Sequence, residues 1–189
     1  FSLTTKSSRC LPRLQSLCEA FGFLPTYLVS YEMASCPQFV EFGRDVLFRN
    51  AGEIGAHLHG WTCPPFRTLT ADDHFHQPYI TDWDKQPMWD KLHALTSKLE
   101  NQFGHDIVTH RSGRWALNDR YVKMLRKRGY KVDCSVTPFV SWRKVPGVPG
   151  GRGGSNYQTF PYNEYFVDVD NYRMPGESSL LEVPVTIRP

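Results

Sequence analysis

Apolar side chains recur along this chain with two different spacings. Four stretches repeat them every three to four residues, which is typical of helices that bury one face. Five shorter stretches are rich in β-branched and aromatic residues, which favour strands. The predicted helices span residues 11–22, 37–50, 87–104 and 118–129, and the predicted strands span residues 25–33, 53–59, 107–115, 130–138 and 179–187. Helices that alternate with strands predict an α/β fold with right-handed βα units around a parallel sheet.

The helix predicted at 87–104 has a clear core-facing side. Leu92, Leu95 and Leu99 share one face at helical spacing, and we expect them in the core. The first helix carries a comparable apolar face, which holds Leu11, Leu14, Leu17, Cys18 and Phe21. Both helices are followed by glycine, which commonly ends a helix.

Two segments lack a regular spacing. Residues 60–86 contain three prolines and the cluster DDHFHQPY, and their histidines and aromatic residues argue for a functional loop rather than for disorder. Residues 139–162 are rich in glycine and proline, and they fit either a flexible surface loop or a loop beside a substrate.

Polar residues gather where the predicted strands end. In parallel α/β folds the carboxyl ends of the strands meet at one edge of the sheet, where ligands bind. We therefore predict that His57, Arg111, Asp133 and Thr186 lie at one rim.

His57 and His59 stand two residues apart at the end of one predicted strand. Residues i and i+2 of a strand point to the same side, so the two imidazoles are able to bind one metal ion. The alternative is a pair of histidines that pack against Trp61.

The loop at 60–86 repeats this pattern with His74 and His76, next to Asp72 and Asp73. An open zinc site takes three protein ligands, and two histidines with one carboxylate suffice. The loop is thus a candidate source of the third ligand. The alternative is a solvated or substrate-facing polar loop.

The segment HRSGRW places Arg111 and Arg114 after another predicted strand. An arginine at a strand end orients a carboxylate through two parallel hydrogen bonds. These residues are therefore candidates to clamp a catalytic aspartate or an anionic substrate, or to form a structural ion pair.

Composition narrows the function classes. Charged residues make up 22% of the 189 residues, and the net charge of +3 is spread along the chain, which argues against nucleic-acid binding. No apolar run approaches a transmembrane length. Five cysteines without disulfide-like or CxxC spacing predict reduced thiols and slightly favour a cytoplasmic protein. The nucleophile elbow, the P-loop and the dinucleotide-binding glycine motif are all missing from the sequence.

Four motifs in order resemble the polysaccharide deacetylase family: EIGAHLHGW followed by PP, HRSGRW, GYKVDCSVTP and LLEVPVTI. The resemblance spans about residues 11–187 and is nearest to a divergent bacterial branch associated with surface-polysaccharide synthesis. It implies a single domain over 1–189 with the family's irregular (β/α) barrel.

The resemblance also implies roles for particular residues. His57 matches the first histidine of the family's metal-binding motif. The usual second histidine falls at Trp61, so His59 is the candidate here. Arg111 matches the arginine that lines the pocket. Asp133 falls near the family's substrate-groove aspartate, without the tryptophan that usually follows.

Arg114 is a neighbour of the matched arginine, and we include it among the substrate-binding candidates. Trp61, Trp115 and Tyr79 are candidates to stack on sugar rings.

Two family features are missing from this sequence. The family opens with a strand that bears adjacent aspartates, one a general base and one a metal ligand. It ends with a strand that bears a histidine acid. We therefore predict that the chain is the middle of a longer protein with an incomplete barrel, rather than an open, inactive remnant.

The predicted function is a metal-dependent hydrolase that removes N- or O-linked acetyl groups from a sugar or polysaccharide, with zinc as the expected metal. Two alternatives stay open. One is an inactive carbohydrate-binding or scaffold domain of the same fold, and the other is a metal amidohydrolase for a small non-sugar amide.

Overall fold

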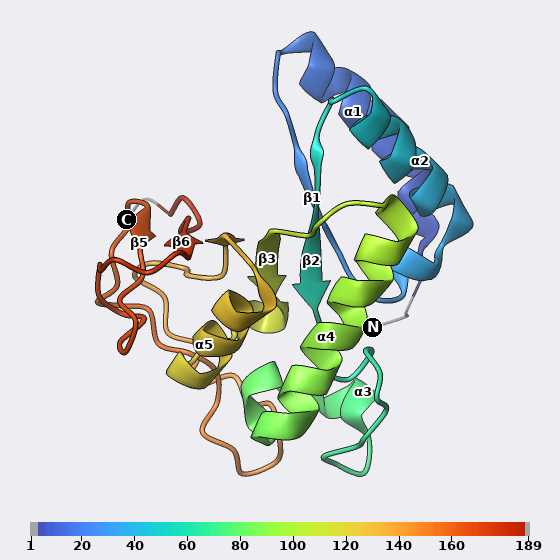
Figure 1. The fold of residues 1–189 in the computed structure, drawn as a ribbon. Helices are drawn as coiled ribbons and strands as arrows, with labels where there is room; N and C mark the ends of the chain where they lie inside the picture. Colours follow the sequence, from blue (N-terminus) through green and yellow to red (C-terminus); the bar gives the residue numbers. More distant parts are fainter. Residues whose placement is uncertain (1–3, 188–189) are drawn as a thin grey trace.

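The computed structural model describes residues 4–187, which form a six-stranded sheet covered by helices (Figure 1). The parallel strands, in order across the sheet, are β1 (Thr26–Val29), β2 (Glu53–Leu58), β3 (Thr109–Ser112), β4 (Val132–Asp133) and β6 (Leu181–Glu182). At the far edge, β5 (Tyr165–Phe166) pairs antiparallel with β6. The predicted α/β fold with a parallel sheet is therefore confirmed, while β5 is too short to leave a signal in the sequence.

Four long helices follow the predicted positions to within a few residues. They are α1 (Leu11–Ala20), α2 (Pro37–Phe48), α4 (Lys85–Phe103) and α5 (Asp119–Arg128). Helices α2 and α4 pack against β2, and α5 lies beside α4. The unpredicted elements are α3 (Asp73–His76) and the 3₁₀ turns η1 (Lys6–Cys10), η2 (Met33–Ser35), η3 (Ile80–Asp82) and η4 (Gly113–Trp115).

The sheet is open within residues 4–187, because β1 and β5 stand at its two ends. Parallel pairing brings the carboxyl ends of β1, β2 and β3 to one edge, where His57 is the register partner of Arg111. In the same part of the chain, no helix has both the length and the apolar character to cross a bilayer.

Helix α1 departs from the prediction made from its apolar spacing. Leu14, Leu17 and Phe21 are 46%, 56% and 70% exposed, whereas Gln15 is buried. The Gln15 side chain donates to the Ala51 carbonyl and accepts from the Tyr27 hydroxyl, and these bonds hold this polar side chain on the inward side of the helix. The other two residues of the predicted face, Leu11 and Cys18, are half-buried, and Leu11 packs against the core. Periodicity therefore predicted the helix, but it did not show that Leu14, Leu17 and Phe21 are exposed.

Helix α4 buries the face that its sequence predicts, since Leu92, Leu95 and Leu99 are fully buried. We expect Leu95→Ala to lower the free energy of unfolding by about 2–5 kcal/mol, because the lost contacts leave a cavity in a packed core. Urea unfolding monitored by circular dichroism tests this, with Leu14→Ala as the matched control. A surface leucine should change the same quantity by about 0.5 kcal/mol or less. Equal losses in both variants would contradict the assigned core.

Candidate functional site

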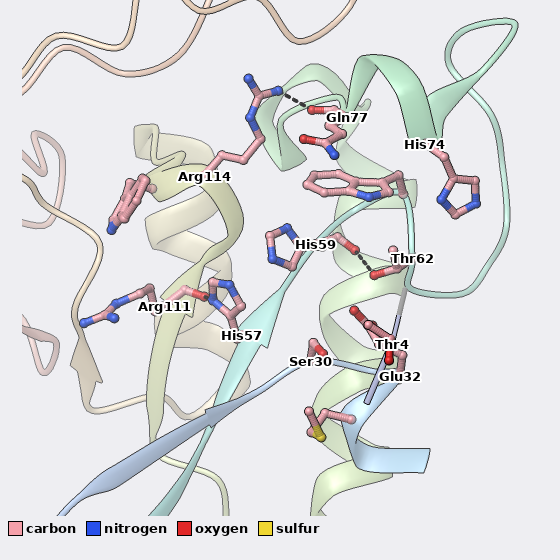
Figure 2. A pocket seen from close by; sticks show the side chains of 13 residues that line it. Thr4, Ser30, Glu32, His57, His59, Thr62, His74, Gln77, Arg111 and Arg114 are labelled. Carbon is pink, nitrogen blue, oxygen red and sulfur yellow. Dashed lines mark hydrogen bonds between the residues drawn. The ribbon is translucent and has the colours of Figure 1, made fainter. Parts of the chain in front are cut away.

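A cavity of about 490 Å³ opens at the carboxyl ends of β1, β2 and β3 (Figure 2). Its size lies in the usual range for small-molecule sites, about 300–1,000 Å³. From β2 and the loop that follows, the cavity is lined by His57, His59, Trp61 and His74. From the end of β3 it is lined by Arg111, Arg114 and Trp115. Seven predicted site residues from distant parts of the sequence therefore share one cavity.

The end of strand β2 presents the two histidines to this cavity, His57 from within the strand and His59 from the residue that follows it. Their ring centroids are 4.5 Å apart, and the rings are nearly perpendicular. Nδ1 of His57 lies 3.0 Å from the carbonyl oxygen of Arg111. A carbonyl only accepts, so Nδ1 carries the proton and Nε2 keeps its lone pair. A backbone contact of this kind fixes the ring orientation of a metal-binding histidine.

Both imidazoles are neutral near pH 7. Burial, together with the nearby His59, lowers the pKa of His57 to about 3. Burial also lowers the pKa of His59, although the negative charge of Glu32 acts in the opposite direction and raises it. Neutral imidazole is the form that binds metals, so the pair is ready to act as ligands without losing a proton.

His59 is held tightly between neighbours. Its ring centroid is 4.5 Å from that of Trp61, and on the other side it meets the backbone of Gly113. A Cβ atom at position 113 would lie 2.5 Å from Nδ1 of His59 and 2.5 Å from the carbonyl oxygen of Leu58. The glycine of RSGRW therefore lets the ends of β2 and β3 approach closely enough to hold this ring.

We expect Gly113→Ala to lower the free energy of unfolding by about 1–3 kcal/mol, because the added methyl group overpacks a site with no free space. The same variant should weaken metal binding, since the ring of His59 must move. Denaturant unfolding and zinc titration measure the two effects. An alanine variant with wild-type values for both would show that the two strand ends are not packed as described.

The donor set fits two positions of a zinc site. His57 offers Nε2, and His59 offers one nitrogen of a neutral ring whose Nδ1 atom is enclosed beside Gly113 without a hydrogen-bond partner. Within residues 4–187, no group of three or more histidine, cysteine, aspartate or glutamate side chains is arranged to hold a metal ion. The third ligand of an open zinc site is therefore missing from the described part of the chain.

The loop carboxylates do not supply that ligand. Asp72 is exposed and caps α3 by accepting from the Phe75 amide. Asp73 is buried and accepts from the amides of Leu69 and Thr70 and from the Thr70 hydroxyl. Neither residue lines the cavity, and neither does His76. Their expected role as metal or pocket residues is corrected by this geometry, because local capping bonds occupy both carboxylates.

Both arginines donate hydrogen bonds to backbone carbonyls. Nε of Arg111 donates to the Cys134 carbonyl at 2.9 Å, so Arg111 ties the ends of β3 and β4 together. The Arg114 guanidinium donates to the carbonyls of Gln77 and Pro146, and it lies 4.0 Å from the centre of the Tyr79 ring. Arg114 thus joins the two irregular loops at the wall of the cavity.

Trp115 reaches the cavity through an unusual backbone. Arg114 and Trp115 have φ values of 55° and 53°, a left-handed conformation that large side chains rarely adopt. The Tyr157 hydroxyl donates to the Trp115 carbonyl, and the Trp115 ring stacks on Trp142 at 4.9 Å. Strain of this kind persists only where the surroundings over-determine it, and it occurs often at functional sites.

Asp133 does not line the cavity, which corrects the expectation that it contacts substrate. Its side chain is fully buried, and Oδ1 is 2.6 Å from Nδ1 of His110. Ser135 donates to the same carboxylate through its amide and its hydroxyl. Asp133 is the register partner of His110 on one side and of Glu182 on the other. It therefore joins β3, β4 and β6.

The predicted position of Thr186 at the same rim was wrong. Thr186 lines a separate groove together with Phe139.

Glu32 lines the cavity and was missed from the sequence. It follows β1, which ends at Val29, so it stands at the same edge as His57 and His59. The sequence prediction extended this strand to Met33, which hid the carboxylate inside a strand. A strand end placed four residues earlier, at Val29, would have marked Glu32 as another polar residue at the functional edge.

Comparison with known proteins adds the fold but no close relative. No protein-family model matches the sequence, and no curated protein matches it. A solved structure from Mycobacterium smegmatis, proposed to be a polysaccharide deacetylase, matches with a TM-score of 0.58 and 19% identity. The match covers 93% of this chain and 45% of that one. This chain has the polysaccharide deacetylase fold.

A second solved structure extends the comparison. It is a CE4-family pseudoenzyme from Bacillus anthracis, with a TM-score of 0.50 and 11% identity over 75% of this chain and 43% of that one. The chain thus spans less than half the length of either protein. At these identities the likeness establishes the deacetylase fold, and the chemistry has to be argued from the cavity.

Proposed function

We propose that this chain forms part of a metal-dependent hydrolase that removes N- or O-linked acetyl groups from a carbohydrate. The observation that carries the proposal is the pair of neutral imidazoles of His57 and His59, held rigidly in a cavity at the carboxyl ends of parallel strands. The fold shared with a protein proposed to be a polysaccharide deacetylase supports the same reaction class. The proposed setting, surface-polysaccharide synthesis, rests on the sequence resemblance.

His57 and His59 would hold the ion through two ring nitrogens, with the remaining ligand supplied from elsewhere in the complete protein. Zinc bound there would polarise the acyl carbonyl and acidify water. The other lining residues contribute shape and orientation. The Arg111 carbonyl keeps the ring of His57 aimed, and Gly113 leaves room for His59.

The walls of the cavity suit a sugar. Trp61 and Trp115 both line it, and an aromatic ring offers an apolar face with a polar edge, which complements a ring that is apolar on its face and edged with hydroxyl groups. We propose that these side chains hold the sugar beside the histidine pair.

A second candidate is a carbohydrate-binding domain that has lost the chemistry. It is favoured by the missing third ligand within residues 4–187. It is also consistent with a CE4-family pseudoenzyme among the proteins of similar fold.

Acetate release by the zinc-loaded, full-length protein separates these functions. We expect release from N-acetylated chito-oligosaccharides or O-acetylated xylo-oligosaccharides, and none from a small N-acetylated diamine. Sugar binding without acetate release would favour the inactive binding domain. Release from the diamine alone would favour a small-amide hydrolase and contradict the proposal.

A further inference from the structure

Three of the residues that line the cavity carry a polar side-chain atom that no group within residues 4–187 satisfies. Oε2 of Glu32, Nδ1 of His59 and Nε1 of Trp115 are each buried without a hydrogen-bond partner, and all three residues line the cavity. An unpaired buried polar atom destabilises the fold by about 1–3 kcal/mol, so such atoms are rare in native proteins. Three such atoms around one cavity indicate a polar ligand.

The three atoms differ in whether they donate or accept a hydrogen bond. The Glu32 carboxylate, when ionised, only accepts hydrogen bonds, and the indole Nε1 of Trp115 only donates. The Nδ1 atom of His59 does either, depending on its tautomer. A hydroxyl group both donates and accepts, so a ligand with several hydroxyl groups pairs with the Glu32 and Trp115 atoms, while His59 is left for the metal.

Charge distinguishes Glu32 from the rest of the lining. Of the described residues that line the cavity, it alone carries a carboxylate. The guanidinium groups of Arg111 and Arg114 donate to the carbonyls of Cys134, Gln77 and Pro146, which are neutral, so both arginines keep their positive charge away from the end that holds Glu32 (Figure 2). Figure 2 shows Glu32 at the end of the cavity where Thr4, Ser30 and Thr62 also lie. That end is therefore acidic and rich in hydroxyl groups, and it repels an anionic ligand group.

We propose that Glu32 is a substrate-binding residue that accepts a hydrogen bond from a hydroxyl group of an uncharged sugar, and that its carboxylate discriminates against carboxylated sugars. This inference deepens the proposed function and rests on it. Trp115 Nε1 would donate to an oxygen of the same sugar. Glu32 is thereby separate from the histidine pair, which the metal would occupy.

Calorimetric titration of the full-length protein in EDTA tests this binding without metal. The first probe is tri-N-acetylchitotriose, which is uncharged. We expect Glu32→Ala to weaken its binding roughly 10- to 100-fold, as loss of a hydrogen bond to a charged group does. Glu32→Gln keeps one acceptor oxygen and should weaken it less. Glu41→Gln, an exposed glutamate on α2, is the matched control and should bind like wild type.

A second pair of probes isolates the charge. N-acetylmuramic acid differs from N-acetylglucosamine by a lactyl group that carries a carboxylate. We expect wild type to prefer N-acetylglucosamine, and Glu32→Gln to shift the ratio of the two affinities toward N-acetylmuramic acid. The bulk of the lactyl group is the same for both proteins, so a change in the ratio reports charge alone.

The outcomes separate the inference from the proposed function. Equal binding by wild type and Glu32→Ala, or an unchanged preference in Glu32→Gln, would overturn the role of Glu32 and leave the deacetylase proposal standing. Loss of zinc affinity in Glu32→Ala with sugar binding intact would make Glu32 a metal ligand and also overturn the role. If wild type binds none of these N-acetylated sugars, the carbohydrate proposal fails and the role of Glu32 fails with it.

Discussion

His57→Ala is expected to lower the zinc affinity of the full-length protein by about 100-fold or more and to abolish metal-dependent acetate release. Even changes to residues that only orient a metal ligand typically cost 10- to 100-fold in affinity. His57 is a better candidate for a metal ligand than His59, because its Nδ1 atom donates to the Arg111 carbonyl and leaves Nε2 free. Competitive zinc titration against a chromophoric chelator measures the change.

His93→Ala is the matched control. His93 is exposed on α4 and stacks on Trp89, away from the cavity. The substitution removes one imidazole outside the cavity, so the zinc affinity of this variant should equal that of wild type. Equal zinc binding by the His57 and His93 variants would leave a packed histidine pair as the better account of HLH.

Asp133→Ala is expected to lower the free energy of unfolding by about 3–5 kcal/mol, the largest stability effect we predict for a single change. The substitution leaves Nδ1 of His110 and the amide and hydroxyl of Ser135 without their partner in a fully buried site. Removing one member of a buried, hydrogen-bonded pair costs this much because the other member stays desolvated. Denaturant unfolding near pH 7 measures it, and a loss below about 1 kcal/mol would contradict the network.

Glu182→Gln provides the contrast on the neighbouring strand. Burial and the nearby Asp133 raise the pKa of Glu182 well above its usual range, so the folded protein retains this proton to a higher pH than the unfolded chain does. Burial alone would also raise the pKa of Asp133, but the hydrogen bond and charge of His110 lower it overall. Glutamine has the shape and the hydrogen-bonding groups of a protonated glutamate. It should therefore be tolerated near pH 5.

The pH dependence of this variant has a definite sign. Above the usual glutamate pKa, unfolded wild type loses a proton that the folded state retains, so the stability of wild type falls as pH rises. Glutamine has no such proton. The free energy of unfolding of Glu182→Gln minus that of wild type should therefore increase from pH 5 to pH 8, by at most about 1.4 kcal/mol per pH unit. A difference that is constant with pH would show that Glu182 is ionised in the fold.

Much of the local structure was predictable because it depends on neighbours in sequence. The four long helices and the β2 and β3 strands follow from spacing, and Gly104 and Gly129 end α4 and α5 in the left-handed conformation that favours glycine. The convergence of His57 and Arg111 was also predictable. Parallel pairing alone brings the carboxyl ends of neighbouring strands together.

The sequence by itself determined the α/β architecture, the positions of the helices and the edge where polar residues meet. The tertiary structure decided which of those residues face the cavity, because burial and hydrogen bonding depend on contacts between distant segments. Asp133 stands at a strand end, as a site residue would, yet hydrogen bonds with His110 and Ser135 hold its side chain in the interior. Glu32 gives little signal in the sequence, yet the end of β1 at Val29 brings it into the cavity, where its oxygen has no partner.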